Sequence, residues 1–121
     1  MNDIPSIRPR RLRATPAWRR LARETRVDPT QLVLPLFVRE GVTEAQPIAS
    51  MPGVVQHSLD SLKAEVTRAA AAGIGGVMLF GVPEHKDAIG SGATDPDGIL
   101  NVATRVAVAE AGDALVVQTD L

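Results

Sequence analysis

The stretch Gly76-Val-Met-Leu-Phe-Gly-Val82 is a continuous apolar run in the middle of this 121-residue sequence. A short apolar run without polar alternation predicts a parallel strand that is covered on both faces. Upstream, Leu32-Val-Leu-Pro-Leu-Phe-Val38 predicts a second strand. Pro35 inside that run cannot donate a ladder hydrogen bond, so it marks an edge, a bulge or a local break. A third run, Ala114-Leu-Val-Val-Gln-Thr-Asp-Leu121, predicts a strand at the end of the sequence.

Helical patterns occupy the intervals between these strands. Ser58, with Ser61 as a competitor, is the expected N-cap of a helix that ends at Gly73, where a left-handed C-cap fits. Asp97 is the expected N-cap of a second helix over Gly98–Ala111. Strands that alternate with helices predict an α/β fold with a parallel sheet, and both a flavodoxin-like sheet and a (β/α)8 barrel begin this way. Because the pattern stops after a third strand, we expect the chain to hold the opening third of a repeating β/α protein.

Two segments between the regular elements have turn or loop composition. Met51-Pro52-Gly53 has the order that a type II turn prefers, and Ile48 and Val54-Val55 beside it predict a small hairpin. Residues 83–97 are rich in Gly, Ser and Asp and are expected to form a polar loop.

The N-terminal part of the chain is strongly basic. Residues 1–26 hold eight arginines and two acidic residues, a net charge of +6, whereas residues 27–121 have a net charge of −7. Thr15-Pro16 predicts a helix start, and Trp18 and Leu21 lie on one stripe of that helix. We therefore predict a basic arm with a short helix over residues 1–30 and a β/α unit over residues 31–121. The arm is expected to contact an acidic body, within a subunit or between subunits; the alternative is an arm for nucleic acid or anionic lipid.

Composition excludes several classes of protein. There is no cysteine, so disulfides, thiolate metal sites and a cysteine nucleophile are excluded within this sequence. No apolar run approaches the roughly 18 residues that span a bilayer, and no secretory signal is visible near the N-terminus. These features predict a cytoplasmic protein without a membrane partner.

The carboxyl ends of the strands are where a parallel β/α protein places its ligands. Asp120 is the sharpest candidate there, because this carboxylate directly follows an apolar strand. The alternative is a strand-end Asp that caps the next helix.

Other candidates carry weaker signals. Gly90-Ser-Gly-Ala-Thr94 precedes a helix and could hold an anion, but two Asp and no Arg or Lys accompany it. His57 and His85 lack metal-ligand spacing. Lys63 lies on the polar face of a predicted helix and Lys86 in a loop, whereas a Schiff-base lysine needs a buried strand end.

Several short sequence motifs, taken together, resemble those of one family, porphobilinogen synthase, also called δ-aminolevulinic acid dehydratase. They occur in the family's order: Arg8-Pro9-Arg10-Arg11-Leu12-Arg13, Leu34-Pro35-Leu36-Phe37-Val38-Arg39-Glu40-Gly41, Ser50-Met51-Pro52-Gly53-Val54, Leu79-Phe80-Gly81-Val82-Pro83 with Lys86-Asp87, Gly90-Ser91, Asp95-Pro96-Asp97-Gly98, and Thr119-Asp120-Leu121. The resemblance covers nearly all of this chain and roughly the first third of the family's length.

The resemblance implies a (β/α)8 TIM barrel with an N-terminal arm that wraps a neighbouring subunit in a homo-oligomer, usually an octamer. It implies a lyase that condenses two 5-aminolevulinate molecules into porphobilinogen with loss of two waters, for haem and other tetrapyrroles. It also implies an active-site role for Asp120. Trp18 and Leu21, expected as a buried stripe of the arm helix, favour subunit packing over a nucleic-acid partner. The arginines of the arm would serve subunit contacts.

The resemblance also predicts what this chain lacks. Both Schiff-base lysines and the ligands of a zinc or magnesium ion would lie beyond Leu121, so the 121-residue chain is expected to be inactive alone. A small β/α interaction module with a basic nucleic-acid-binding arm is the alternative from another class of protein.

Overall fold

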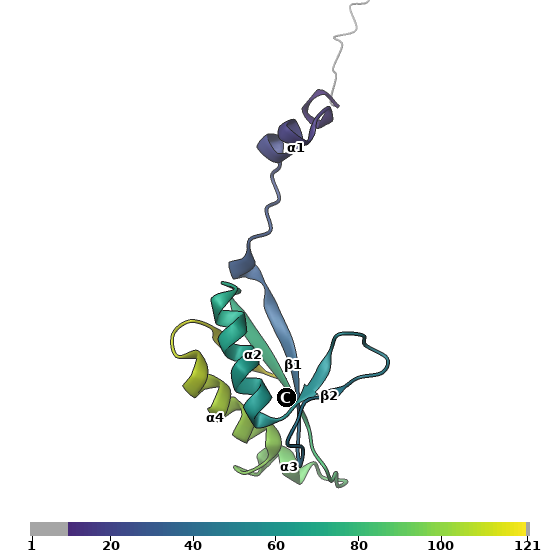
Figure 1. The fold of residues 1–121 in the computed structure, drawn as a ribbon, viewed down its shortest axis with the longest axis vertical. Coiled ribbons are helices and arrows are strands. Elements are labelled where there is room, and N and C mark those ends of the chain that lie inside the picture. The colour runs from purple at the N-terminus through teal and green to yellow at the C-terminus, as the bar shows by residue number, and fades with distance from the viewer. Residues whose placement is uncertain (1–9, 121) are drawn as a thin grey trace, which may run out of the picture.

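The computed structural model describes residues 10–120, which form five strands, four α-helices and two 3-10 helices. In chain order these are η1 (Arg11–Arg13), α1 (Pro16–Ala22), η2 (Pro29–Gln31), β1 (Val33–Arg39), β2 (Gln46–Pro47), β3 (Val55–His57), α2 (Leu59–Ala71), β4 (Gly76–Val82), α3 (Ser91–Thr94), α4 (Ile99–Ala111) and β5 (Val116–Thr119). The expected alternation of strands and helices is confirmed (Figure 1).

The strands form one sheet in the order β2-β3-β1-β4-β5. β1 and β4 pair in parallel along their whole length, from Val33 opposite Gly76 to Arg39 opposite Val82. β5 continues the sheet in parallel on the other side of β4. The three predicted strands are therefore neighbours, as consecutive β/α units should be.

The predicted hairpin is also present. β2 and β3 are antiparallel, and the Val54 N–H donates to the Met51 carbonyl oxygen at 3.0 Å. Gly53 has a φ of +84°, which fits the third position of a type II turn and which L side chains rarely adopt. Sequence patterns missed the next step, in which β3 adds to the sheet in parallel with β1 at Phe37 and Val38.

This pairing explains how a proline is accommodated in β1. Among residues 10–120, β3 pairs with β1 only near its carboxyl end, so Pro35 lies where one side of β1 is unpaired. A proline at such an edge costs no ladder hydrogen bond. Pro35 is thus an edge residue, one of the three predicted possibilities.

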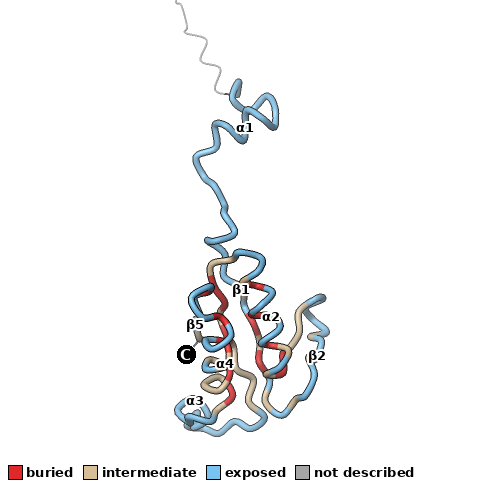
Figure 2. The backbone as a smooth tube through the Cα atoms, turned by 60° about the vertical axis from the view of Figure 1, so that its left-hand side comes forward, coloured by how far each residue is buried: buried red, intermediate tan, exposed pale blue. Residues whose placement is uncertain are grey.

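Both long helices, α2 and α4, cover the same face of the sheet (Figure 1). We call this face the covered face. Its side chains and those of the helices form the core, and Figure 2 colours the buried residues red along the backbone. The buried apolar residues are Leu36, Val38, Leu62, Val66, Ala69, Val77, Leu79, Ile99, Ala103, Ala107, Ala111 and Leu115.

The opposite face of the sheet has no helix against it among the described residues. We call it the open face, and it carries alternate side chains of β1, β4 and β5: Val33, Pro35, Phe37, Met78, Phe80, Val82, Val116 and Gln118. Each of them is exposed or partly exposed. The Phe37 and Phe80 rings lie side by side here, with centroids 5.4 Å apart. The prediction that β4 is covered on both faces is therefore wrong for residues 10–120.

Two of the three predicted helix N-caps are confirmed, and so is the left-handed Gly73 at the end of α2, with a φ of +73°. The Thr15 hydroxyl accepts from the Trp18 N–H at 3.2 Å, and the Ser58 hydroxyl accepts from the Ser61 N–H at 3.2 Å. The prediction for Asp97 is wrong, because Gly98 occupies the N-cap of α4 and has no side chain to cap with.

Asp97, which does not cap α4, makes other contacts. Its N–H donates to the Asp95 carboxylate at 2.9 Å, and its own carboxylate lies 3.7 Å from Arg105. A turn at the end of the loop thus takes the place of a capping side chain.

The helix α1 of the arm stands away from the sheet and from α2 and α4 (Figure 1). This helix ends at Ala22, and Trp18 and Leu21 are 48% and 72% exposed, so the expected apolar stripe is not buried within the described residues. The predicted split into an arm over residues 1–30 and a β/α unit over residues 31–121 stays a prediction. Among the helices formed by residues 10–120, none is long and apolar enough to cross a membrane.

Candidate active site

Asp120 directly follows β5 at the carboxyl edge of the sheet. Its N–H donates to the Leu79 carbonyl oxygen at 3.2 Å, which continues the pairing of β5 with β4. By strand alternation Asp120 shares the open face with Gln118, and its side chain is exposed. The carboxylate therefore lies where the ends of the parallel strands meet the open face.

A cavity of about 320 Å³ opens beside Asp120. Phe80 and Gly81 at the end of β4 and Leu100 of α4 line it. The segment from Pro83 to Gly98, which we call the β4–α4 loop, supplies more than half of the residues that line it. The cavity is mostly apolar with a polar rim, as is usual for small-molecule sites.

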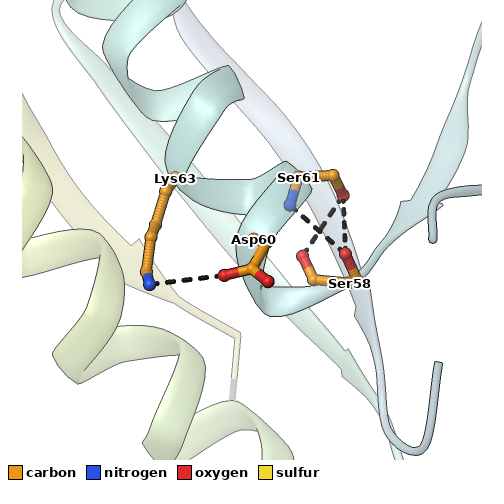
Figure 3. Close-up of polar contacts among 4 residues, drawn as sticks. All are labelled: Ser58, Asp60, Ser61 and Lys63. Atoms are coloured by element: carbon orange, nitrogen blue, oxygen red, sulfur yellow. Dashed lines mark hydrogen bonds and ion pairs between the residues drawn. The ribbon is translucent and has the colours of Figure 1, made fainter. Parts of the chain in front are cut away.

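This cavity is also lined by two residues that the sequence patterns did not favour as site residues. His85 and Lys86 lie on the β4–α4 loop and share the cavity wall with Asp120. The signal that could have found them is their position just past the carboxyl end of a strand, where β/α proteins place functional loops. Lys63 lies elsewhere, at the start of α2, where its ammonium group pairs with the Asp60 carboxylate at 3.4 Å (Figure 3).

The glycine-rich stretch at Gly90–Thr94 is occupied by the chain's own carboxylate. The Ser91 N–H donates to Asp87 Oδ1 at 2.9 Å, and the Ser91 hydroxyl donates to Asp87 Oδ2. These hydrogen bonds, chiefly the one from the hydroxyl, hold the pKa of Asp87 below its usual value. Since Asp87 already takes the place of an anion, the arrangement argues against phosphate binding there.

A hydrogen bond links the loops that follow β1 and β4. The Glu84 N–H donates to Glu40 Oε2 at 2.8 Å, while the Glu40 N–H donates to the Val82 carbonyl oxygen at 2.9 Å. Glu40 and Glu84 are 44 residues apart, so no local pattern predicts this contact. It fixes the start of the β4–α4 loop relative to the sheet.

Two side chains of α4 hold the other end of the β4–α4 loop. The Asn101 amide donates to the Ala93 carbonyl oxygen at 3.1 Å and to the Asp95 carbonyl oxygen at 2.7 Å. The Arg105 guanidinium group donates to the Pro96 carbonyl oxygen at 2.7 Å. Sequence reasoning missed both residues, although their spacing of one helical turn places them on the same side of α4.

His57 lies on the covered side, at the junction of β3 and α2. Its ring is buried, and Nδ1 lies 3.1 Å from the Ser61 hydroxyl oxygen. Burial lowers the pKa of His57, the negative charge of Glu65 raises it and the positive charge of Arg68 lowers it further. Within residues 10–120, no three His, Cys, Asp or Glu side chains gather as a metal site.

The sequence was compared with families of known proteins. The family model described as Delta-aminolevulinic acid dehydratase matches residues 6–121. The chain belongs to the delta-aminolevulinic acid dehydratase family. The predicted resemblance is thereby confirmed.

Curated members of this family are similar over nearly the whole chain. The dehydratase of Streptomyces coelicolor is 59% identical over 121 residues, which are 98% of this chain and 37% of the relative. The dehydratase of Mycobacterium tuberculosis H37Rv is 54% identical and that of Synechocystis is 43% identical, over 99% and 97% of this chain. The chain spans about 37% of the length of the first two of these relatives.

A solved structure of the family has the same fold. The delta-aminolevulinic acid dehydratase (porphobilinogen synthase) of Toxoplasma gondii, in complex with the reaction product porphobilinogen, superposes with a TM-score of 0.79 and 35% identity. The match covers 93% of this chain and 32% of that one. The sheet and helices of this chain are therefore part of the family's (β/α)8 barrel, as the resemblance implied.

Proposed function

We propose that this chain is the N-terminal part of a porphobilinogen synthase, a lyase that condenses two 5-aminolevulinate molecules into porphobilinogen with loss of two waters. The observation that carries the proposal is the match in fold to a dehydratase that binds this product. On this proposal the open face is the inner face of the barrel. Its apolar side chains then pack against strands supplied by the rest of the protein.

The same geometry supports our expectation that the 121-residue chain is inactive alone. The five strands formed by residues 10–120 make an open sheet and do not close a barrel, and the open face remains without a covering layer among these residues. The Schiff-base lysines lie in the remaining part of the protein by family resemblance. The cavity beside Asp120 is then one wall of the active site and not the whole of it.

Asp120 is the catalytic candidate of this segment. Its exposed carboxylate at the carboxyl end of β5 is suited to hold a substrate ammonium group or to move protons near the Schiff-base lysine. Its place on the open face, beside a cavity, supports this role over that of a helix cap. His85 and Lys86 on the same wall are suited to bind the polar ends of the substrate.

A zinc or magnesium ion belongs to the proposal through family resemblance only. Within residues 10–120 no set of three ligating side chains gathers, so this segment does not fit the ion by itself. The remaining part of the protein would supply the ligands. No step assigned to Asp120 depends on that ion.

The basic arm supports a homo-oligomer, which by family resemblance is an octamer in the cytoplasm. Its apolar residues Trp18 and Leu21 are exposed in the single chain, and the net charge of +6 on residues 1–26 is opposite in sign to the −7 on residues 27–121. The acidic body of a neighbouring subunit would cover the exposed apolar residues of the arm and pair with its arginines. Sedimentation of the complete protein with and without residues 1–26 tests this, since the deletion should reduce the size of the assembly.

The exposure of Trp18 beside arginines also fits the alternative of a nucleic-acid-binding arm. Family membership favours subunit contacts, because the curated relatives are enzymes that share this part of the chain. Binding of duplex DNA or RNA that weakens steeply with salt would support the alternative.

Turnover is the test of the main proposal. The complete protein that carries this sequence should convert 5-aminolevulinate into porphobilinogen, measured by mass spectrometry of the product. The isolated 121-residue chain should not. Absence of product from the complete protein, or turnover by the isolated chain, would contradict the proposal.

A further inference from the structure

The β4–α4 loop supplies most of the wall of the cavity but has little packing of its own. Every residue from Glu84 to Asp97 is exposed, so burial of apolar side chains does not set its conformation. Segments without buried contacts open easily unless polar contacts hold them. The hydrogen bonds that tie this loop to the rest of the molecule therefore determine the shape of the cavity.

Asn101 makes the most specific of these bonds. Both N–H groups of its amide are used, one on the Ala93 carbonyl oxygen and one on the Asp95 carbonyl oxygen. Because both partners are acceptors, the amide nitrogen and not its oxygen must face the loop. The two bonds bracket the end of α3 and hold it against the first turn of α4.

Close packing at the same place supports this arrangement. A Cβ added to Gly98 would lie 2.1 Å from the Gly92 carbonyl oxygen and 3.1 Å from that of Asp95. The backbones of α3 and of the start of α4 thus touch, with no room for a side chain at Gly98. Arg105 adds a third contact, to the Pro96 carbonyl oxygen.

We propose that Asn101 is a positioning residue, which holds the β4–α4 loop in the conformation that lets the cavity beside Asp120 accept substrate. It does not touch the reacting atoms and acts through Ala93 and Asp95. Arg105 assists from one turn further along α4, with a smaller effect because its side chain is more than half exposed. This inference rests on the proposed function, since the substrate is 5-aminolevulinate.

Asn101→Asp in the complete enzyme is the sharpest variant. The side chain keeps its shape, and a carboxylate in the first turn of a helix is favourable, so the fold should survive. The two donors, however, are replaced by an oxygen that repels the carbonyl groups of Ala93 and Asp95. Thr104→Val is the matched control, because the Thr104 hydroxyl donates to the Leu100 carbonyl oxygen at 2.7 Å within α4 and not to the loop.

We expect Asn101→Asp to raise the KM for 5-aminolevulinate about tenfold while kcat changes by less than about threefold, the pattern of a misplaced binding wall. Amide hydrogen exchange over residues 84–98 should become faster, while exchange in β4 and the thermal midpoint stay near wild type. Arg105→Gln should shift KM and exchange in the same direction by less. Thr104→Val should change neither.

An unchanged KM, or unchanged exchange over residues 84–98, overturns the role of Asn101 while leaving the proposed function intact. An equal change from Thr104→Val also overturns it, because the effect would then come from a weakened helix. Absence of turnover by the wild-type enzyme is a different result. It refutes the proposed function and with it the link to the substrate.

Discussion

The two faces of one sheet differ sharply in this molecule. On the covered face, neighbouring side chains such as Val38, Val77 and Leu79 are fully buried under α2 and α4. On the open face, the residues between them in sequence, such as Phe37 and Met78, remain partly exposed. Both faces are apolar, so composition does not distinguish them. The difference shows that the described residues complete one core, and it supports our proposal that the open face belongs to a second one.

The largest expected effect compares adjacent residues of β4. In the 121-residue chain, Leu79→Ala on the covered face should lower the free energy of unfolding by about 2–5 kcal/mol, because it leaves a cavity in a packed core. Met78→Ala on the open face should cost less than about 1 kcal/mol. Urea titration followed by circular dichroism measures both.

The same two variants, Leu79→Ala and Met78→Ala, test whether the open face is the inner face of a barrel. In the complete protein, Met78→Ala should become about as costly as Leu79→Ala, because the open face is then the packed inner face. A cost for Met78→Ala that stays below about 1 kcal/mol there would contradict our assignment of the open face.

Asp120→Ala tests chemistry at the edge of the open face. In the complete enzyme it should reduce turnover by about 10²-fold, the scale of a positioned acid–base group, and leave the thermal midpoint nearly unchanged. Asp113→Ala is the control, since Asp113 is exposed at the other end of β5. Lost stability with preserved activity would instead identify Asp120 as a helix cap.

Gly98→Ala tests the contact between the β4–α4 loop and α4. The added methyl group would collide with the Gly92 carbonyl oxygen, so we expect a loss of about 1–3 kcal/mol in the free energy of unfolding. Gly92→Ala is the control, because a methyl group there would meet no atom of another segment within 4 Å. It should be neutral or stabilise by up to about 1 kcal/mol. Equal effects on denaturant stability would contradict the close packing.

The smallest expected effect is a pH dependence on the covered side. Because burial lowers the pKa of His57 below its ordinary value of 6.5, the unfolded chain binds more protons than the folded chain below that pH. Stability should therefore be retained above pH 6.5 and fall as the pH drops through the lowered pKa. His57→Asn keeps a polar side chain that can hydrogen-bond to Ser61 and has no such titration.

Denaturant titrations of both proteins between about pH 7 and pH 5 measure this difference, in a range where the carboxylates remain largely ionised. If the wild-type chain and His57→Asn lose stability in parallel over this range, burial of the neutral histidine is not the cause.

Local patterns predicted much of the fold. Apolar runs identified β1, β4 and β5, and the turn at Met51–Gly53 and the caps at Thr15 and Ser58 followed from their own side chains. These features depend on residues within one turn of each other, so a sequence contains the information directly. The order of several short sequence motifs along the chain also identified the family, because a match at many positions in one order is far more specific than any single motif.

Other features arose from contacts between distant segments. The Asn101 amide meets a loop whose conformation no periodicity encodes, and Glu40 meets Glu84 across 44 residues. Asp97 was expected to cap α4, but a turn with Asp95 took that place. Lys86 was set aside as a loop residue and lies on the cavity wall.

By itself, the sequence determined the order of strands and helices, most of their caps and the family. These follow from local periodicity and from short sequence motifs that occur in the family's order. Only the tertiary structure decided which face of the sheet is covered, because an apolar strand has the same pattern whether one face or both are packed. It also decided that β3 joins β1 and that Asn101 meets the β4–α4 loop. Such hydrogen bonds form between segments that only the folded chain brings together.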